Sequence, residues 1–320
     1  MLWLERAYSR LGLPFWLGAV ITSLAIPFAL EELDSYLANL DLVPTVVNSV
    51  IILVLFFYLQ WGARFACRKM ERLQEYAGSL ASEDVSKVLK SLYSGGAVLV
   101  TWLLVAAILL PTSFEGGVSL TAIAKAHVVP ATYSYLIFAF FLWVYGYSML
   151  SIYRMGKLPL NLKSFAEDKT LGLKPFGAAS LRLTALYEVP LVLLTIPDVA
   201  DNRLVVVTQD VSLMLLGLAL FLLPLLSLRN KLVQVKTREL GWISPLYVRI
   251  VQKMKSENNP QIDEKLARDL GVIDKIQRDI HQIRTWPFDA AIIARLLSLT
   301  ILPVTLTVLA RLLIILTLHV

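Results

Sequence analysis

Four ionisable residues lie within otherwise apolar stretches of this chain: Glu188, Asp210, Arg295 and Arg311. A charge inside a lipid bilayer is costly unless it is paired, so residues of this kind are candidates for function. At a helical rise of about 1.5 Å per residue, Glu188 and Arg295 each lie about 8 to 9 Å from one end of an apolar stretch, and Asp210 and Arg311 each lie about 10 to 13 Å from the opposite end. We therefore predict two intramembrane ion pairs, Glu188 with Arg295 and Asp210 with Arg311. The alternative is that each arginine side chain extends independently to the lipid headgroups.

The last apolar stretch also carries a polar stripe. At about 100° per residue, Thr300, Thr307 and Arg311 fall on one narrow face of a helix. Hydroxyl and guanidinium groups on one face are typical of a water-filled path, so these three residues are candidates for lining a pore. The alternative is that the threonine hydroxyls bond backbone carbonyls of their own helix beside Pro303.

Other chemistry is poorly represented in the sequence. The single cysteine excludes a disulfide framework and a thiolate metal cluster, and the three histidines have no metal-ligand spacing. No nucleophile elbow, acid and base pair or phosphate-binding loop is recognisable, so we expect neither an enzyme nor a cofactor. Tyr133 and Tyr135 are candidates for an aromatic ligand pocket, although packing and contact with lipid are commoner roles for such residues.

The composition is typical of a membrane protein with several spans. Of the 320 residues, 57% are apolar and 17% are charged, and the mean hydropathy is +0.67. Soluble domains contain about 25% charged residues, so this composition excludes an ordinary soluble protein and a disordered one. A helix needs about 20 apolar residues to cross the hydrocarbon core. The candidate spans are 11–30, 42–63, 91–114, 126–153, 183–197, 204–228 and 290–320, of which 183–197 is the weakest because it holds Glu188 and two prolines.

Lysine and arginine are placed unevenly around these stretches. With seven spans and a cytosolic N-terminus, the cytosolic segments hold 26 of the 30 lysines and arginines, in agreement with the bias of basic residues toward the cytosol. We therefore predict an all-α integral protein of the cytoplasmic (plasma) membrane with seven transmembrane helices, N-terminus in and C-terminus out. A re-entrant segment at 183–197 is the alternative, but it would leave the two flanking basic segments on opposite sides of the membrane.

Helical periodicity continues outside the predicted spans. We expect residues 1–228 to hold transmembrane helices one to six, with a cytosolic helical hairpin at 64–94. Residues 229–288 are expected to form a second cytosolic helical hairpin, and residues 289–320 the seventh transmembrane helix. The extended helices of both hairpins would together form a cytosolic helical anchor.

The second predicted hairpin has two different arms. In the first arm, one helix is expected to stop at Gly241 and another to begin at Ser244. This arm is basic, which indicates contact with anionic lipid headgroups or a nucleotide. The alternative is that its lysines and arginines only reflect the bias of basic residues toward the cytosol. It has no feature of a nucleic-acid groove. The second arm carries an apolar stripe over 262–283 that must be buried against the first arm, the 64–94 hairpin or another subunit.

Two segments, LGLKPFG at 171–177 and TWPFDAAIIARLL at 285–297, carry a resemblance to known proteins. The glycines and proline of the first predict a tight turn. Together the segments resemble a widespread set of prokaryotic multi-pass membrane proteins, a resemblance that implies no function.

The layout of the whole chain is similar to the seven-transmembrane ion channel superfamily that includes insect odorant and gustatory receptors. The similarity lies in an inside N-terminus, helices prolonged into a cytosolic anchor, and a last helix split between cytosol and membrane. It implies a homotetramer with a central pore lined by the last helix and a small-molecule pocket among the earlier spans. The expected function is thus a homotetrameric ion channel that a ligand would gate. The alternative is a non-conducting membrane scaffold or sensor that signals through its cytosolic helices.

Overall fold

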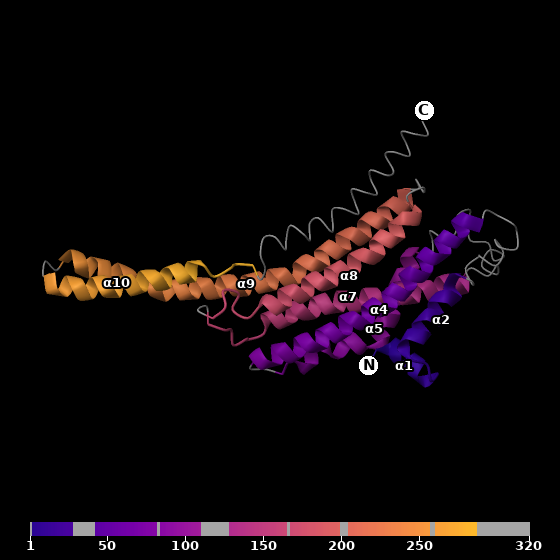
Figure 1. The fold of residues 1–320 in the computed structure, drawn as a ribbon, viewed down its shortest axis with the longest axis horizontal. Helices are drawn as coiled ribbons and strands as arrows, with labels where there is room; N and C mark the ends of the chain where they lie inside the picture. Colours follow the sequence, from indigo (N-terminus) through magenta and orange to yellow (C-terminus); the bar gives the residue numbers. More distant parts are fainter. Residues whose placement is uncertain are drawn as a thin grey trace, which may run out of the picture.

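The fold is built from helices, as the sequence predicted. The computed structural model describes residues 2–27, 42–81, 84–109, 128–164, 167–198, 204–256 and 260–286. Within these ranges every regular element is a helix (Figure 1). In chain order the elements are α1 (Trp3–Arg10), α2 (Phe15–Pro27), α4 (Leu42–Leu80), the 3-10 helix η2 (Val85–Tyr93), α5 (Gly95–Leu109), α7 (Val128–Lys157), α8 (Lys174–Asp198), α9 (Leu204–Ser256) and α10 (Pro260–His281).

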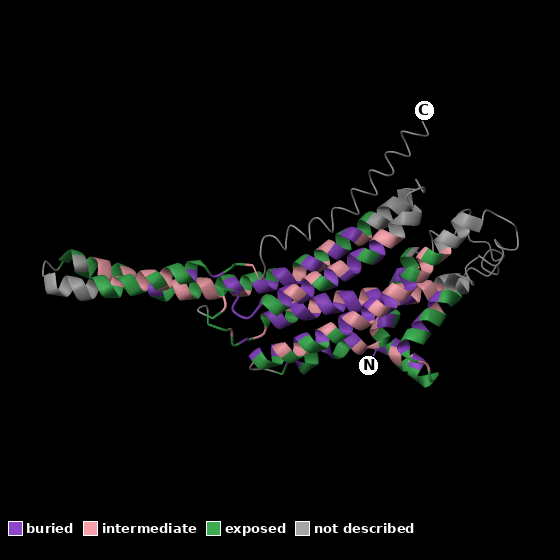
Figure 2. Cartoon of the chain, in the orientation of Figure 1, coloured by how far each residue is buried: buried purple, intermediate pink, exposed green. Residues whose placement is uncertain are grey.

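Helix α7 lies at the centre of the bundle. It packs against α4, α5, α8 and α9, and large buried side chains such as Phe141, Tyr145 and Tyr187 gather around it. Buried residues (purple in Figure 2) therefore concentrate where these helices meet. Gly217 of α9 lies directly against the ring of Tyr187, and a Cβ atom at this position would stand 2.3 Å from the ring carbon Cε1. The missing side chain is what lets α9 approach α8 so closely.

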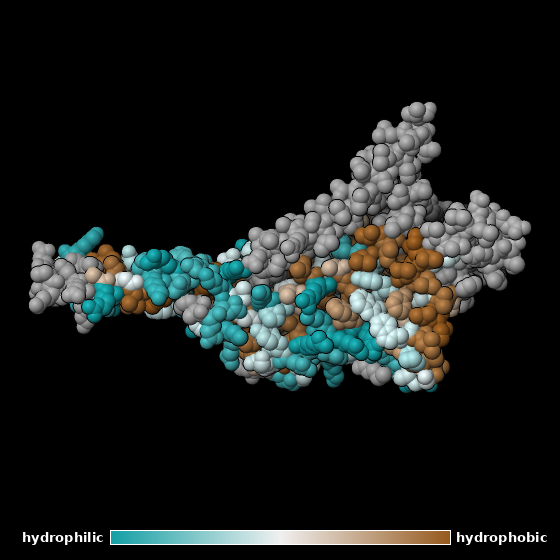
Figure 3. Space-filling view, viewed as in Figure 1, coloured by the Kyte–Doolittle hydropathy of each residue, from teal (hydrophilic) through white to brown (hydrophobic). Residues whose placement is uncertain are grey.

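Several helices are long and apolar enough to cross a membrane. Their outer faces also suit a membrane. On helix α5, for example, Leu99, Leu104 and Ile108 are each more than half exposed, and contact with lipid would be more favourable for these side chains than contact with water. Figure 3 shows apolar side chains gathered over the end of the bundle away from the long hairpin, and hydrophilic ones over much of the hairpin and the part of the bundle next to it. By length and composition the candidate spans are Ser49–Leu80, Thr132–Lys157, Lys174–Leu193 and Val211–Lys253, with a fifth if Val85–Tyr93 and Gly95–Ile108, which are bent by 52°, count as one span.

These helices are those of an integral membrane protein, and the prediction of membrane character is confirmed. The weakest predicted span, 183–197, belongs to the continuous helix α8, and Lys174–Leu193 is one of the candidate spans. The first predicted span contains the shorter apolar helix Phe15–Ala25. The seventh predicted span lies outside the described residues, so the total of seven and the orientation of the termini stay predictions.

Helix α9 is much longer than a membrane is thick. Its 53 residues correspond to about 80 Å, whereas the hydrocarbon core measures about 30 Å. The C-terminal part of α9 therefore extends beyond the bundle, where α10 folds back along it; we call this unit the α9–α10 hairpin (Figure 1). Ile280 and Ile283 are buried near its base. Of the three surfaces that the sequence offered to the apolar stripe of the second arm, the structure shows that it packs on the first arm.

The expected helix break at Gly241 is wrong, because α9 continues through both Gly241 and Pro245. A proline inside a helix removes the hydrogen bond to the carbonyl four residues earlier, here that of Gly241. Both residues are exposed, so water can bind this carbonyl and the helix need not end.

The loop between α7 and α8 forms the predicted tight turn. Leu171 and Gly172 have φ angles of 55° and 85°. The carboxylate of Asp168 accepts hydrogen bonds from the backbone N–H groups of Thr170 (2.8 Å) and Gly172 (2.9 Å). Burial raises the pKa of Asp168, but these hydrogen bonds outweigh it and hold the pKa below its usual value. The hydroxyl of Tyr76 donates to the carbonyl of Gly172 at 3.0 Å and ties the turn to α4.

The base of the α9–α10 hairpin is joined to this loop. The backbone N–H of Arg284 donates to the carbonyl of Lys169 at 3.2 Å, and the Lys169 ammonium donates to Gln282. On α9, Lys236 donates to the carbonyl of His281 at 2.7 Å, and the guanidinium of Arg229 lies 5.2 Å from the ring of Trp286. These residues of the basic arm therefore have structural contacts at the point where the hairpin leaves the bundle.

Candidate functional site

Glu188 is the predicted intramembrane charge whose side chain the structure describes. It lies on α8 with 4% of its surface exposed, and within the described chain neither carboxylate oxygen has a hydrogen-bond partner. Arg295, Thr300, Thr307 and Arg311 lie outside the described residues, as does the side chain of Asp210. The two ion pairs and the pore-lining stripe therefore stay predictions.

Two stacked tyrosines lie next to Glu188 and do not donate hydrogen bonds to its carboxylate. The rings of Tyr145 on α7 and Tyr187 on α8 stack with centroids 4.4 Å apart. Their hydroxyls donate to backbone carbonyls of α9, that of Tyr187 to Leu213 at 2.9 Å and that of Tyr145 to Gly217 at 3.3 Å. Both hydroxyls thus donate to α9 and not to Glu188, whose carboxylate is buried without a hydrogen-bond partner in the described chain.

Tyr133 and Tyr135, the predicted ligand-pocket residues, lie near the start of α7 and are partly buried. Tyr133 lies beside Thr22 of α2. Neither residue lines the cavity described below, so their role in ligand binding stays a prediction.

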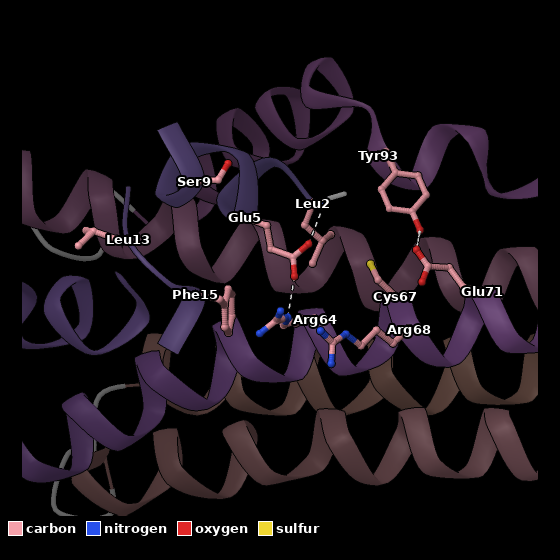
Figure 4. Close-up of a pocket in the computed structure, with 10 residues that line it drawn as sticks. All are labelled: Leu2, Glu5, Ser9, Leu13, Phe15, Arg64, Cys67, Arg68, Glu71 and Tyr93. Carbon is pink, nitrogen blue, oxygen red and sulfur yellow. Dashed lines mark hydrogen bonds and ion pairs between the residues drawn. The ribbon is translucent and has the colours of Figure 1, made fainter. Parts of the chain in front are cut away.

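The structure contains a cavity that the sequence did not predict. It has a volume of about 330 Å³ and lies between α1, the start of α2, α4 and the end of η2 (Figure 4). Its charged and polar groups come from three helices, and its apolar wall comes mainly from the N-terminal segment. The lining residues are Leu2, Glu5, Ser9, Leu13, Phe15, Arg64, Cys67, Arg68, Glu71 and Tyr93.

The charged groups of this cavity are partly paired. Nε of Arg64 lies 2.6 Å from Oε1 of Glu5, but its N–H does not point at an acceptor, so the contact is an ion pair without a directed hydrogen bond. The Arg64 guanidinium also lies 4.3 Å from the ring centroid of Phe15. Across the cavity, the Tyr93 hydroxyl donates to Oε1 of Glu71 at 2.5 Å. Arg68 is exposed and makes no ion pair or hydrogen bond with the described part of the chain.

A buried polar cluster fixes α1 over α2 and α4 and so shapes the cavity. The Tyr8 hydroxyl donates to Oε1 of Gln60 at 2.5 Å, and Nε2 of Gln60 donates to the hydroxyl of Ser23 at 3.2 Å. Thr22 lies 2.9 Å from the Tyr8 hydroxyl and completes the cluster. Gln60 is a polar residue in an otherwise apolar run, and that signal in the sequence could have pointed to the cluster.

No protein-family model, curated protein or solved structure matches this chain. Its class therefore follows from its own features, which are those of an all-helical integral membrane protein with a charged cavity beside its N-terminal helix. Over the described ranges, no group of three or more histidine, cysteine, aspartate or glutamate side chains could hold a metal ion.

Proposed function

We propose that this protein is a homotetrameric ion channel of the seven-transmembrane type, gated by a ligand and placed in the cytoplasmic membrane with its N-terminus inside. Its pore would be lined by the last helix, with Thr300, Thr307 and Arg311 facing the ion path. The predicted layout of spans and cytosolic helices suggests this function, and one structural observation supports it.

That observation is the buried carboxylate of Glu188. A carboxylate that is 4% exposed in a membrane-crossing helix, with no hydrogen-bond partner in the described chain, is costly to maintain. Such a group persists where it meets a cation or a polar path. In the proposed channel Glu188 pairs with Arg295 at the inner end of the last helix, and this pair draws the pore-lining helix against α8.

The α9–α10 hairpin supports assembly into a tetramer. Trp242, Val248 and Val272 on this hairpin are about half exposed. Large apolar side chains on a unit that extends beyond the bundle favour contact with another protein. In the proposed tetramer that contact is a neighbouring subunit.

Ion flux through liposomes that contain the purified protein tests the proposal. Thr307→Trp should abolish flux by filling the pore. Thr305→Trp is the matched control, because a position two residues away lies about 200° around the helix and should leave flux intact. Flux no greater than that of protein-free liposomes, or equal loss in both variants, would contradict the channel.

The exposed apolar residues of the α9–α10 hairpin also favour the second candidate, a non-conducting membrane scaffold or sensor. The stoichiometry of the detergent-solubilised protein separates the two. A tetramer with flux supports the channel, whereas a monomer without flux supports the scaffold.

A further inference from the structure

The cavity beside the N-terminal helix combines opposite charges with an apolar wall. Arg64 and Arg68 contribute two guanidinium groups, and Glu5 and Glu71 contribute two carboxylates, so the lining has no net formal charge. Phe15 stands at the apolar side of the same cavity. A ligand of matching chemistry carries one anionic group, one cationic group and an apolar part.

The position of the cavity indicates where this ligand comes from. Arg64 is the first charged residue after the uncharged run 42–63, so it lies at the level where a membrane-crossing helix meets the headgroups. Trp16 and Leu17 of α2 are about half exposed and follow Phe15 directly, so the lipid-facing surface of α2 begins at the cavity wall. A lipid could therefore place its headgroup in the cavity and its acyl chains along α2.

We propose that this cavity binds the headgroup of a phospholipid that carries both a phosphate and a primary amine, as ethanolamine phospholipids do. The phosphate meets the guanidinium groups of Arg68 and Arg64, and the ammonium group meets the carboxylates of Glu71 and Glu5. The acyl chains lie on the exposed face of α2. This inference does not depend on whether the protein conducts ions.

Three of the four groups that would hold the headgroup have donors or acceptors to spare; on Glu5, Oε1 pairs with Arg64 and Oε2 accepts the backbone N–H of Leu2 at 3.3 Å. Arg68 is exposed without a partner in the described chain, and a guanidinium offers up to five N–H donors, so the ion pair to Glu5 leaves most of those on Arg64 available. Tyr93 occupies one oxygen of Glu71 and orients the carboxylate across the cavity. The second Glu71 oxygen makes no hydrogen bond with the described residues. Figure 4 shows these groups around the same space.

The balanced charge separates ethanolamine from other headgroups. A purely anionic headgroup would leave the two carboxylates facing a negative charge. A choline headgroup has no N–H and cannot donate hydrogen bonds to them. A cavity of about 330 Å³ is within the range of small-ligand sites.

Native mass spectrometry of the full chain, delipidated in detergent, tests the proposal with three diacyl lipids of equal chain length that carry ethanolamine, choline or glycerol headgroups. We expect the ethanolamine lipid to bind most tightly, and Arg68→Gln to weaken its binding about tenfold, as loss of one charge-assisted contact should. The matched control is Arg72→Gln, which removes the same charge one turn further along α4 outside the cavity and should leave affinity unchanged. Since Arg68 and Arg72 are both exposed, both variants should fold, and thermal unfolding checks this.

Alkylation at position 9 in the variant Ser9→Cys provides a second readout, because Ser9 is exposed and lines the cavity, whereas the native Cys67 thiol is only 2% exposed. Saturation with the ethanolamine lipid should slow alkylation at position 9, and water-soluble glycerophosphoethanolamine should do so much less because it has no acyl chains. Equal affinity for the three lipids, or equal effects of Arg68→Gln and Arg72→Gln, would overturn the proposal. Equal protection by the soluble compound would overturn the lipid as the source and assign the same headgroup chemistry to a free metabolite.

Discussion

Replacing Gly217 by alanine should destabilise the contact between α8 and α9. The new Cβ atom would stand 2.3 Å from Cε1 and 2.7 Å from Cδ1 of Tyr187. Ordinary contacts begin at 3.4 Å, so the ring or the helix would have to move by about 1 Å in a close-packed interior. The ring has no free space for this movement, because Tyr187 is 1% exposed, stacks on Tyr145 and donates its hydroxyl to Leu213.

The expected size follows from two opposing effects. Overpacking of a buried site costs about 1 to 3 kcal/mol, and an approach of 2.3 Å places Gly217→Ala in the upper part of this range, at about 2 to 3 kcal/mol. Alanine in place of glycine within a helix stabilises the helix by about 1 kcal/mol. We expect a net loss of about 1 to 2 kcal/mol in the free energy of unfolding for Gly217→Ala.

Reversible unfolding in mixed micelles, followed by tryptophan fluorescence, measures this change. The matched control is Gly146→Ala on α7, where the nearest side-chain atom, Cδ1 of Leu220, would be 3.7 Å from the new Cβ. This variant should be as stable as the wild type or slightly more so. Adding Tyr187→Leu to Gly217→Ala should remove the clash, giving a coupling free energy of about 2 kcal/mol, close to the overpacking cost itself. Wild-type stability of Gly217→Ala, or no coupling with position 187, would refute the reasoning.

Three further predictions concern the turn, the polar cluster and the hairpin. The pKa of Asp168 is lowered in the folded protein, so its carboxylate stabilises the fold above the usual pKa of 3.8, and this stabilisation disappears as the pH falls through the lower folded-state pKa. Asp168→Ala should therefore cost about 2 kcal/mol at neutral pH and clearly less in strong acid, as measured by thermal unfolding at each pH. Tyr8→Phe should cost about 1 to 3 kcal/mol because it leaves the buried Oε1 of Gln60 without its shortest hydrogen bond, whereas Tyr58→Phe, which loses no hydrogen bond to the described residues, should be nearly neutral in the same assay. Gly271→Ala should raise the helix stability of α10 by about 1 kcal/mol, because no atom lies within 4 Å of the new Cβ; a lower unfolding midpoint would contradict this.

Composition and charge were enough to predict the all-helical membrane fold, because uncharged runs of membrane-spanning length have few other stable solutions. Helix α8 shows where averaged hydropathy misleads. Ser180, Thr184 and Glu188 lower its mean hydropathy, yet they recur every four residues on one face, and all three are buried against the bundle. Because these polar groups face protein and not lipid, they do not prevent α8 from being one of the candidate spans.

The cavity could not be predicted from spacing in the sequence. It depends on Glu5 meeting Arg64 and on Glu71 meeting Tyr93, and only the packing of α1 and η2 onto α4 brings these residues together.

The sequence pattern did not predict the continuity of α9 for a different reason. Glycine and proline are local signals for a helix end, whereas the outcome at Gly241 depends on exposure, which the sequence pattern does not reveal.

The absence of a break in α9 has a mechanical consequence. One helix belongs both to the packed bundle and to the extended hairpin, so a movement of one part is passed to the other through continuous helix. The 28 residues beyond Leu228 form a lever of about 40 Å, and a tilt of about 5° at its base would displace its tip by about 4 Å. Conversely, a force applied at the tip of the hairpin would act as a torque on the helices packed around Tyr187.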